Sequence, residues 1–287
     1  MICIFPFAGY SNSDYSAAMQ MADSLVGVHK TDWASAEYER AAFLALNNTD
    51  RTLALLAKTN MLLDLRSYQE AEKTSARLVP FSLQDSLLHQ VHHKSALSAY
   101  LNQNFEGAYN QLLQVEHFLP LSYQVQSALL SILTLNELKK WEDAKQKTIW
   151  WVTNVTDSGS HKQDSVLAAI ELAYREKKYP KTKNPDLAKL FSSIIPGSGQ
   201  LYTGHIFDAA FSAIMVLSGL GIAAAGVFIF KYYVTGAVLG YAVFQRFYQA
   251  GQKRSSYLAE RYNYRKPRKY NDAKSEWLIE MGKALKA

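Results

Sequence analysis

Residues 185–248 read PDLAKLFSSIIPGSGQLYTGHIFDAAFSAIMVLSGLGIAAAGVFIFKYYVTGAVLGYAVFQRFY and contain two long apolar runs separated by one lysine, Lys231. No charged residue occurs from Ala209 to Phe230, and none from Tyr232 up to Arg246. At 1.5 Å of rise per residue, a helix over the first run is long enough to cross the ~30 Å hydrocarbon core of a bilayer. The stretch therefore predicts a helical hairpin with two transmembrane helices.

The rest of the chain is much more polar than this hairpin. The protein has 287 residues, of which 48% are hydrophobic, and its mean hydropathy is slightly negative. A single membrane hairpin attached to polar sequence is typical of an anchored protein and not of a polytopic carrier. The length is sufficient for two modest domains.

The net charge of the chain is concentrated after the hairpin. From position 251 to the end there are ten Lys or Arg and four Asp or Glu, and the difference equals the whole net charge of +6. Basic residues beside an apolar hairpin suit anionic lipid headgroups, at ~1 kcal/mol for each Lys or Arg near the surface. We therefore expect this tail to face membrane lipid, and not nucleic acid, through Lys253, Arg254, Arg265, Lys266, Arg268 and Lys269.

Residues 1–13 form an apolar N-terminus that ends in small and polar residues. This pattern is that of the second half of a secretory signal peptide whose basic n-region is missing. Either the true start lies upstream of Met1, or the segment is a simple apolar tail. The single cysteine, Cys3, excludes an intrachain disulfide and a cysteine-based metal site.

Residues 14–180 contain an internal repeat. Four segments place an aromatic residue three positions before an alanine, and the aromatic positions are 35, 37 and 36 residues apart. Each segment follows an amphipathic run with apolar residues at i, i+3 and i+4, which predicts a pair of helices in each unit. The residues expected to pack the paired helices together are Trp33 and Ala36, Tyr68 and Ala71, Phe105 and Ala108, and Trp141 and Ala144.

These units resemble the tetratricopeptide repeat (TPR), a helix–turn–helix of ~34 residues with small residues at the helix contact and a proline after the second helix. The segment from Tyr68 to Pro80 matches that pattern best. The Trp, Leu-Gly and Tyr that are usual in the first helix are mostly absent. The resemblance implies an all-α, TPR-like solenoid with a groove for a peptide or protein partner. The basic linker 181–185 marks the expected domain boundary.

The turn that precedes the hairpin carries a motif of glycines and polar residues: Pro196, Gly197, Gly199, Gln200, Tyr202 and Gly204. Glycines permit positive φ angles and close backbone packing, and tyrosine is favoured at headgroup depth. This motif, followed by two apolar helices, resembles the two-helix, TM-two-like membrane domains of bacterial envelope proteins over residues 185–263. The resemblance implies a membrane location and an architecture, but little about activity.

Small residues within the hairpin predict close contact between membrane helices. They are Gly221 and Ala225 on the first helix, and Gly236 and Gly240 on the second. Contact within one hairpin is the simpler interpretation, and dimerisation of two chains is the alternative. After the hairpin, residues 264–287 predict a basic tail that is broken at Pro267 and ends in a short amphipathic helix.

Little in the chain indicates catalysis. His89 and His93 are spaced i, i+4 and could hold a metal ion from one helix face, with His92 beside them. Position 90 is glutamine, so the glutamate of the zinc-protease motif is absent, and no third ligand is evident. No phosphate-binding loop or nucleophile motif occurs. We expect no cofactor and no enzymatic activity, and keep a metal-binding enzyme as an alternative.

Two indications of membrane orientation conflict. Lysines and arginines flank the outer ends of both apolar runs, which by the positive-inside rule places the repeats in the cytoplasm. A truncated signal peptide instead places the repeats in the periplasm, and we expect that orientation. The sequence thus predicts a membrane-anchored, non-catalytic adaptor or scaffold that binds a protein partner at the bacterial cell envelope. An integral subunit of a larger membrane assembly or biogenesis machine is the alternative.

Overall fold

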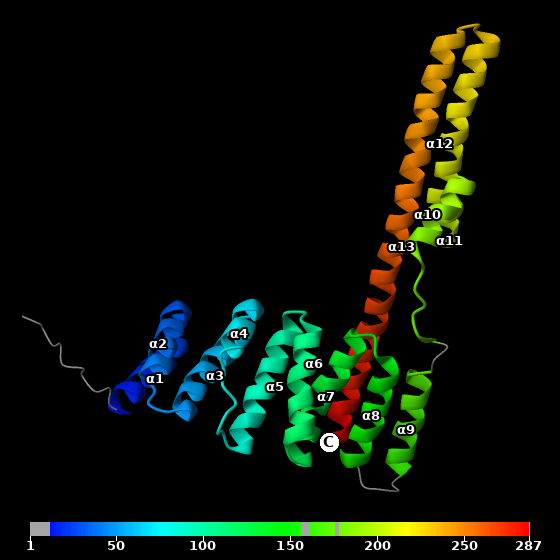
Figure 1. The fold of residues 1–287 in the computed structure, drawn as a ribbon. Helices are drawn as coiled ribbons and strands as arrows, with labels where there is room; N and C mark the ends of the chain where they lie inside the picture. Colours follow the sequence, from blue (N-terminus) through cyan, green and yellow to red (C-terminus); the bar gives the residue numbers. More distant parts are fainter. Residues whose placement is uncertain (1–11, 156–160, 176–177, 287) are drawn as a thin grey trace, which may run out of the picture. The chain divides into compact units, whose positions relative to one another are not determined.

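The computed structural model describes residues 12–155, 161–175 and 178–286. Over these residues the chain is all-α (Figure 1). It forms two compact units, the first made of Met1–Arg175 with Ser275–Ala287, and the second of Glu176–Lys274. The expected boundary near position 180 therefore lies a few residues earlier, and the end of the chain belongs to the first unit. Most of the expected signal-like segment, residues 1–11, lies outside the described residues.

The first unit is a row of helices in which each helix packs against the next (Figure 1). In chain order they are α1 (Asn12–Gly27), α2 (Thr31–Leu44), α3 (Asn48–Asp64), α4 (Tyr68–Ser75), α5 (Asp85–Leu101), α6 (Phe105–Phe118), α7 (Leu121–Glu137), α8 (Trp141–Val155) and α9 (His161–Ala173). α5 also contacts both α3 and α7. The first helices of successive pairs therefore lie side by side.

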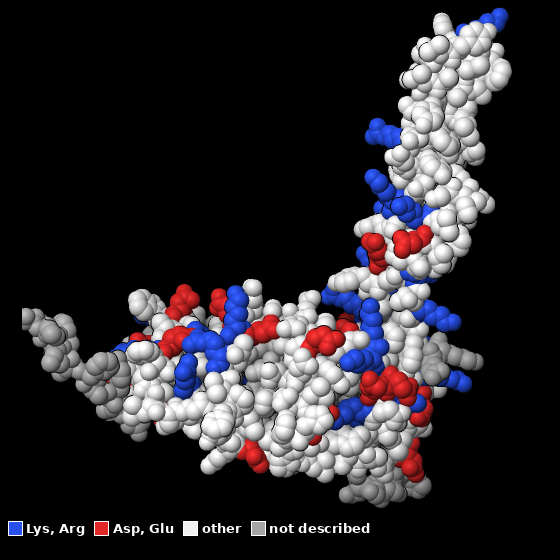
Figure 2. Space-filling model, viewed as in Figure 1, with Lys and Arg blue, Asp and Glu red and all other residues white. Residues whose placement is uncertain are grey.

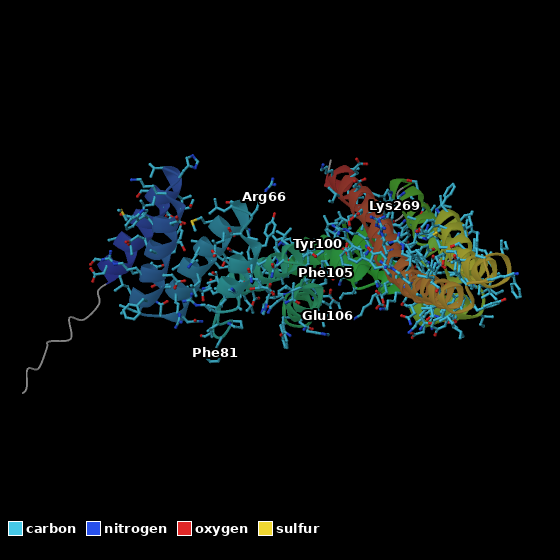
Figure 3. The ribbon with its side chains drawn as sticks, turned by 90° about the horizontal axis from the view of Figure 1, so that it is seen from above. Arg66, Phe81, Tyr100, Phe105, Glu106 and Lys269 are labelled. Atoms are coloured by element: carbon cyan, nitrogen blue, oxygen red, sulfur yellow. The ribbon has the colours of Figure 1, made fainter. Side chains whose placement is uncertain are left out.

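Four of the helix pairs are joined by the same turn. The second residue after the first helix is left-handed, with φ between 57° and 64°, at His29, Arg66, Gln103 and Lys139. The N–H of the following residue donates to the carbonyl five positions earlier, over 2.8–3.0 Å. This is the Schellman arrangement, which satisfies carbonyls at the end of a helix. Arg66 is labelled at its turn in Figure 3. The same local geometry thus returns after 37, 37 and 36 residues.

A fully buried alanine follows each of these turn residues by five positions. Ala71, Ala108 and Ala144 are at positions expected from the sequence, and each is 0% exposed. In the first pair the buried residue is Ala34, also 0% exposed.

The expected packing residues of that first pair are wrong. Trp33 is 70% exposed and Ala36 is exposed. A shift of two residues rotates a helix position by about 200°, from the buried face to the solvent face. The aromatic residue at position 33 suggested the wrong register. Tyr68 is the first residue of its helix, and the residue at that position in the first pair is Thr31.

The three other aromatic positions lie at the start of the second helices. Tyr68, Phe105 and Trp141 are each half-buried. The ring of Phe105 meets the ring of Tyr100 edge-on across the turn, with 5.5 Å between centroids (Figure 3). Such a pair adds about 0.5–1.5 kcal/mol beyond its buried area, so it stabilises the turn between α5 and α6.

The second unit contains α10 (Pro185–Ile194), α11 (Ser198–Tyr202), α12 (Ile206–Ala224), the π-helical turn η2 (Ala225–Ile229) and the first part of α13 (Tyr233–Lys286). The side chain of Asn184 caps α10 by accepting from the N–H groups of Asp186 and Leu187, at 2.8 and 3.3 Å. The chain reverses at Lys231, whose φ is 56°. α12, η2 and the start of α13 form a helical hairpin (Figure 1).

Small residues bring the two helices of the hairpin into backbone contact. A Cβ added to Gly226 would lie 2.5 Å from the Cα of Gly236, and one added to Gly219 would lie 2.6 Å from the backbone nitrogen of Phe244. Gly240 faces Ala223 just as closely. Gly236 and Gly240 were expected at a helix contact and lie at one.

The sequence predicted Gly221 and Ala225 as the contact residues of the first helix, and this prediction is wrong for Gly221. A Cβ on Gly221 would meet nothing within 4 Å, so Gly221 lies off this contact. Ala225 is half-buried. The helix presents Gly219, Ala223 and Gly226 to its partner instead, because these positions, and not 221, share the inner face.

Among the described residues, one helical stretch, Ile206–Ile229, is long and apolar enough to cross a membrane. Only 17% of its apolar window is buried inside the protein. The start of α13 is less apolar and does not pass the same test, so one candidate span is found where two were expected.

The break expected at Pro267 does not occur, because α13 continues through this residue to Lys286. Proline lacks an N–H, so the carbonyl of Asn263 loses its helical partner, at a cost of ~3 kcal/mol. One lost bond in a helix this long leaves the turns on both sides intact. The basic tail is therefore the second half of a helix that begins in the hairpin.

Candidate functional site

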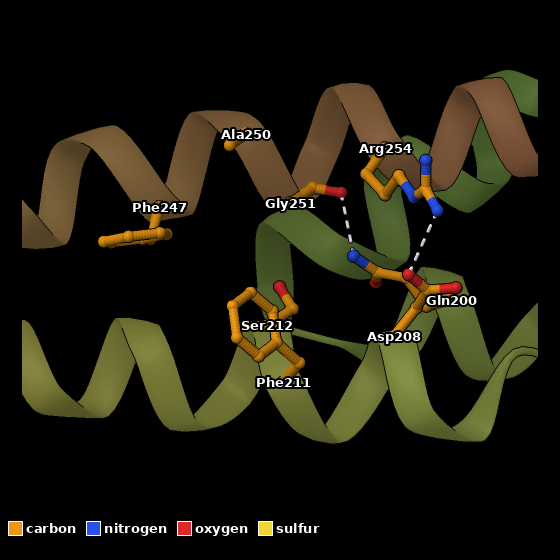
Figure 4. A pocket seen from close by; sticks show the side chains of 8 residues that line it. All are labelled: Gln200, Asp208, Phe211, Ser212, Phe247, Ala250, Gly251 and Arg254. Carbon is orange, nitrogen blue, oxygen red and sulfur yellow. Dashed lines mark hydrogen bonds and ion pairs between the residues drawn. The ribbon is translucent and has the colours of Figure 1, made fainter.

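The motif expected before the hairpin forms a buried polar contact between three helices. Gln200, on α11, is 0% exposed. Its Oε1 accepts from the hydroxyl of Ser192 on α10 at 2.9 Å, and its Nε2 donates to the carbonyl of Gly251 on α13 at 3.0 Å (Figure 4). Its own carbonyl accepts from the hydroxyl of Thr203 at 2.8 Å. One buried amide thus ties α10, α11 and α13 together, which satisfies groups that would otherwise be costly to bury.

The motif glycines allow the backbones to approach. Gly197 has a φ of 95° and Gly204 a φ of 85°, both in the left-handed region that favours glycine. A Cβ on Gly199 would overlap the carbonyl oxygen of Ala188 and lie 2.8 Å from the Cβ of Ser255. The glycine at 199 is therefore required where α10, α11 and α13 cross.

Tyr202 and Pro196 complete the motif at its edge. The ring of Tyr202 packs edge-on against Phe191, with 5.4 Å between centroids, and its hydroxyl accepts from the N–H of Asn184 at 3.3 Å. Pro196 is half-buried. The motif therefore holds the short helices α10 and α11 on the base of the hairpin, which is a structural role.

A cavity of about 390 Å³ lies beside Gln200, between α12 and α13 (Figure 4). The rings of Phe211 and Phe247 form its apolar part. At its polar end Arg254 donates to a carboxylate oxygen of Asp208 over 3.2 Å. This ion pair joins the start of α12 to α13, and the sequence alone did not single out Asp208.

A larger cavity, of about 680 Å³, is a groove on the first unit. It is lined by α5, α7, α8 and the last part of α13. The residues that line it from α13 are Ile279, Gly282, Lys283 and Leu285. These belong to the same unit as α5–α8, so the chain's own C-terminal helix forms one wall of the groove.

The C-terminal segment, residues 275–286, packs on the first unit beside this groove through small and apolar residues. Leu278 is 0% exposed and Met281 is 9% exposed. A Cβ on Gly282 would lie 3.0 Å from the indole ring of Trp151 on α8 and 3.9 Å from Leu129 on α7. Gly282 thus permits a close approach to Trp151, a contact that the sequence did not reveal.

The candidate metal ligands lie in the groove but are engaged with a buried hydroxyl. Nε2 of His89 and Nδ1 of His93 each lie 2.9 Å from Oγ of Ser127 on α7. The imidazole of His89 stacks on Tyr123 with 4.9 Å between centroids. His92 bonds to Gln111 at 2.8 Å, away from the other two. Ser127 thus joins two imidazoles of α5 to α7.

Both imidazoles are held neutral at physiological pH. Burial lowers the pKa of His93 to about 4, with further contributions from the nearby charges of His89 and Lys94. Burial, and secondarily His92, also lowers the pKa of His89. Within the described residues there is no group of three or more His, Cys, Asp or Glu side chains placed to hold a metal ion. The groove thus presents two neutral imidazoles beside apolar side chains and two lysines, Lys94 and Lys283.

The basic residues after the hairpin have different surroundings. Lys253 and Arg265 are exposed, and Arg254 pairs with Asp208 as described. Arg268 donates to the hydroxyl of Tyr264 at 2.7 Å. Lys266 and Lys269 line a third cavity, together with lysines that precede α10. Figure 2 shows Lys and Arg side chains, with some Asp and Glu among them, below the largely uncharged surface of the hairpin.

Comparison of the chain with known proteins gave no match among family models, curated proteins or solved structures.

Proposed function

We propose that this protein is a membrane-anchored adaptor whose first unit binds an α-helical segment of a protein partner. The observation that supports this most directly is the groove of about 680 Å³ lined by α5, α7, α8 and the last part of α13. Its lining combines apolar side chains, among them Val125 and Leu129, with the ring of Trp151, which suits helix-in-groove recognition.

The repeated geometry of the first unit supports a TPR-like array. The same left-handed turn and the same buried alanine return every 36 or 37 residues. In such arrays each unit contacts mainly its neighbours, and the first helices of the pairs line an extended binding surface. The contacts of α5 with α3 and α7 agree with that arrangement.

Anchoring in a membrane is supported by the exposed apolar surface of the hairpin. Phe207, Phe211, Ile214 and Leu217 on α12 are between 62% and 92% exposed. Apolar side chains this exposed along one helix are costly in water and favourable in lipid. We propose that the start of α13 is the second span of a TM-two-like hairpin, and that Lys253 and Arg265 face anionic lipid.

We propose that the repeat unit lies in the periplasm. Alkaline phosphatase inserted after position 170 should then be active in whole cells, and activity of a cytoplasmic reporter alone at that position would reverse the orientation. The adaptor proposal itself does not depend on the side of the membrane.

The adaptor proposal is tested by photo-crosslinking in cells. A photoreactive amino acid replaces His93, which lines the groove, and in a matched variant it replaces Glu106, an exposed residue at the start of α6 that does not line the groove (Figure 3). We expect a discrete crosslinked partner from position 93 and none from position 106. The crosslink should weaken when Val125, a half-buried residue that also lines the groove, is replaced by glutamate, because the added charge opposes binding of an apolar helix face.

Two outcomes would argue against an adaptor. Equal crosslinking from both positions would indicate non-specific proximity. A crosslink from position 93 that Val125→Glu does not affect would indicate a partner bound outside the groove.

A further inference from the structure

A basic and aromatic cavity of about 420 Å³ lies in the second unit, between the segment that precedes α10 and the middle of α13. Lys178 and Lys181 line it from the segment. Lys266 and Lys269 line it from α13, and Tyr262 and Tyr270 add aromatic walls. Lys269 is labelled on α13 in Figure 3.

The α13 wall of the cavity is one helix face. Tyr262, Lys266, Lys269 and Tyr270 are spaced i, i+4, i+7 and i+8, which places them in a single stripe. Tyr179 from the facing segment packs edge-on against Tyr270, with 6.3 Å between centroids. The cavity therefore has lysines on both walls and tyrosine rings between them.

A side-chain clamp holds the two walls together. The amide of Asn263 accepts from the N–H of Lys183 and donates to its carbonyl, both over 2.7 Å. This pair reproduces the hydrogen bonding of a strand partner and fixes the segment along α13. The ammonium of Lys183 lies over the ring of Tyr262, 4.7 Å from its centroid.

The charged residues that line the cavity are lysines. No Asp or Glu is among the described residues that line it. Burial, and secondarily the charge of Lys178, lowers the pKa of the adjacent Lys274 to about 8. Gathering several ammonium groups costs electrostatic free energy, which a bound anion would offset.

We propose that this cavity binds a phosphate group, held by Lys178 and Lys181 from one wall and by Lys266 and Lys269 from the other. Lysine binds phosphate as a point charge, and tyrosine hydroxyls supply further donors. The volume is within the range of small-ligand sites and accommodates a phosphate with a small organic part. The phosphate is carried either by an anionic lipid headgroup or by a soluble phosphate compound. This site is separate from the groove and goes beyond the adaptor function.

The test uses the full-length protein and reads the phosphate directly by phosphorus NMR. In one arm, inorganic phosphate is titrated into the protein in a non-ionic detergent at constant ionic strength. In the other, the protein is placed in nanodiscs of phosphatidylcholine with or without phosphatidylglycerol, in buffer free of phosphate. Binding in the first arm identifies a soluble ligand, and binding in the second alone identifies a lipid headgroup.

Matched variants distinguish phosphate binding at this cavity from general electrostatic attraction to a basic protein. Lys266→Gln with Lys269→Gln should weaken phosphate binding about tenfold or more, the loss expected for two charge-assisted contacts. Lys30→Gln with Lys73→Gln removes the same charge from exposed positions of the first unit and should change binding less than about twofold. Lys266→Arg with Lys269→Arg should retain binding, and circular dichroism confirms that each variant is folded. Equal weakening by the two Gln pairs, or no bound phosphate in either arm, would overturn the proposal.

Discussion

At the scale of single residues, the motif glycines act through the side chain that they lack. A Cβ on Gly199 would overlap the carbonyl of Ala188 and lie 2.5 Å from the hydroxyl of Ser192, which bonds Gln200. We expect Gly199→Ala to destabilise the second unit by about 2–3 kcal/mol, because α10 must move and the buried amide loses a partner. Thermal unfolding of the purified protein in detergent measures this. Gly27→Ala, where a Cβ would meet nothing within 4 Å, should leave the melting temperature unchanged or slightly raised.

The buried imidazoles give the first unit a pH-dependent stability. The pKa of His93 is about 4 in the folded protein and ~6.5 when the chain is unfolded. Because the folded value is the lower one, the unfolded chain binds more protons between these values, and stability falls as the pH drops from about 6.5 to about 4. The full shift corresponds to about 3 kcal/mol. His93→Gln should flatten the pH dependence of urea unfolding over this window. His117→Gln, at an exposed position on α6, should leave it unchanged, and an unaltered slope in His93→Gln would contradict the assignment.

How far these residues could be predicted depends on whether their partners are near in sequence. The motif from Pro196 to Gly204 stands out because glycine, glutamine and tyrosine interrupt an apolar context. Its partners, Ser192 and Gly251, are an ordinary serine and glycine in helices, and only the fold brings Gly251 to Gln200. The spacing of His89 and His93 suggested a metal site, whereas the structure places both imidazoles on Ser127, a residue more than 30 positions away.

At the scale of elements, the hairpin is held by backbone contact through small residues. Gly240 on α13 faces Ala223 on α12, whereas Gly221 faces open space. We expect Gly240→Ala to weaken the hairpin by about 1–3 kcal/mol by forcing the helices apart. Gly221→Ala makes the same chemical change on the same hairpin and should be neutral or slightly stabilising. Unfolding of both variants in a graded detergent mixture compares them, and equal destabilisation would mean that Gly221 also lies at a contact, for example between two chains.

The elements also show where periodicity predicts well and where it fails. Three of the four buried alanines follow from the repeated spacing. In the first unit, Trp33 led to a predicted register two residues late, because the sequence does not show whether a tryptophan is exposed or packed. Proline is a strong signal for a helix end, yet α13 passes through Pro267. A sequence pattern reports local preference, and the packing of a long helix can outweigh one unfavourable residue.

At the scale of the whole molecule, α13 contributes to both units, since its residues through Lys274 belong to the second unit and those from Ser275 belong to the first. The C-terminal segment therefore has two roles: it continues the helix of the hairpin, and it forms one wall of the groove proposed to bind a partner.

Replacing the buried Leu278 by serine removes apolar contact between this segment and the first unit, with a loss on the order of 2–5 kcal/mol at a fully buried leucine. The loss should release the segment and leave α5, α7 and α8 folded. We expect Leu278→Ser to speed hydrogen exchange in residues 275–286 and to let a synthetic 272–287 peptide bind in trans. Glu280→Ser, at an exposed position two residues later, should do neither. If Leu278→Ser instead speeds exchange throughout α5–α8, the segment is part of the core of the unit and not a separable wall of its groove.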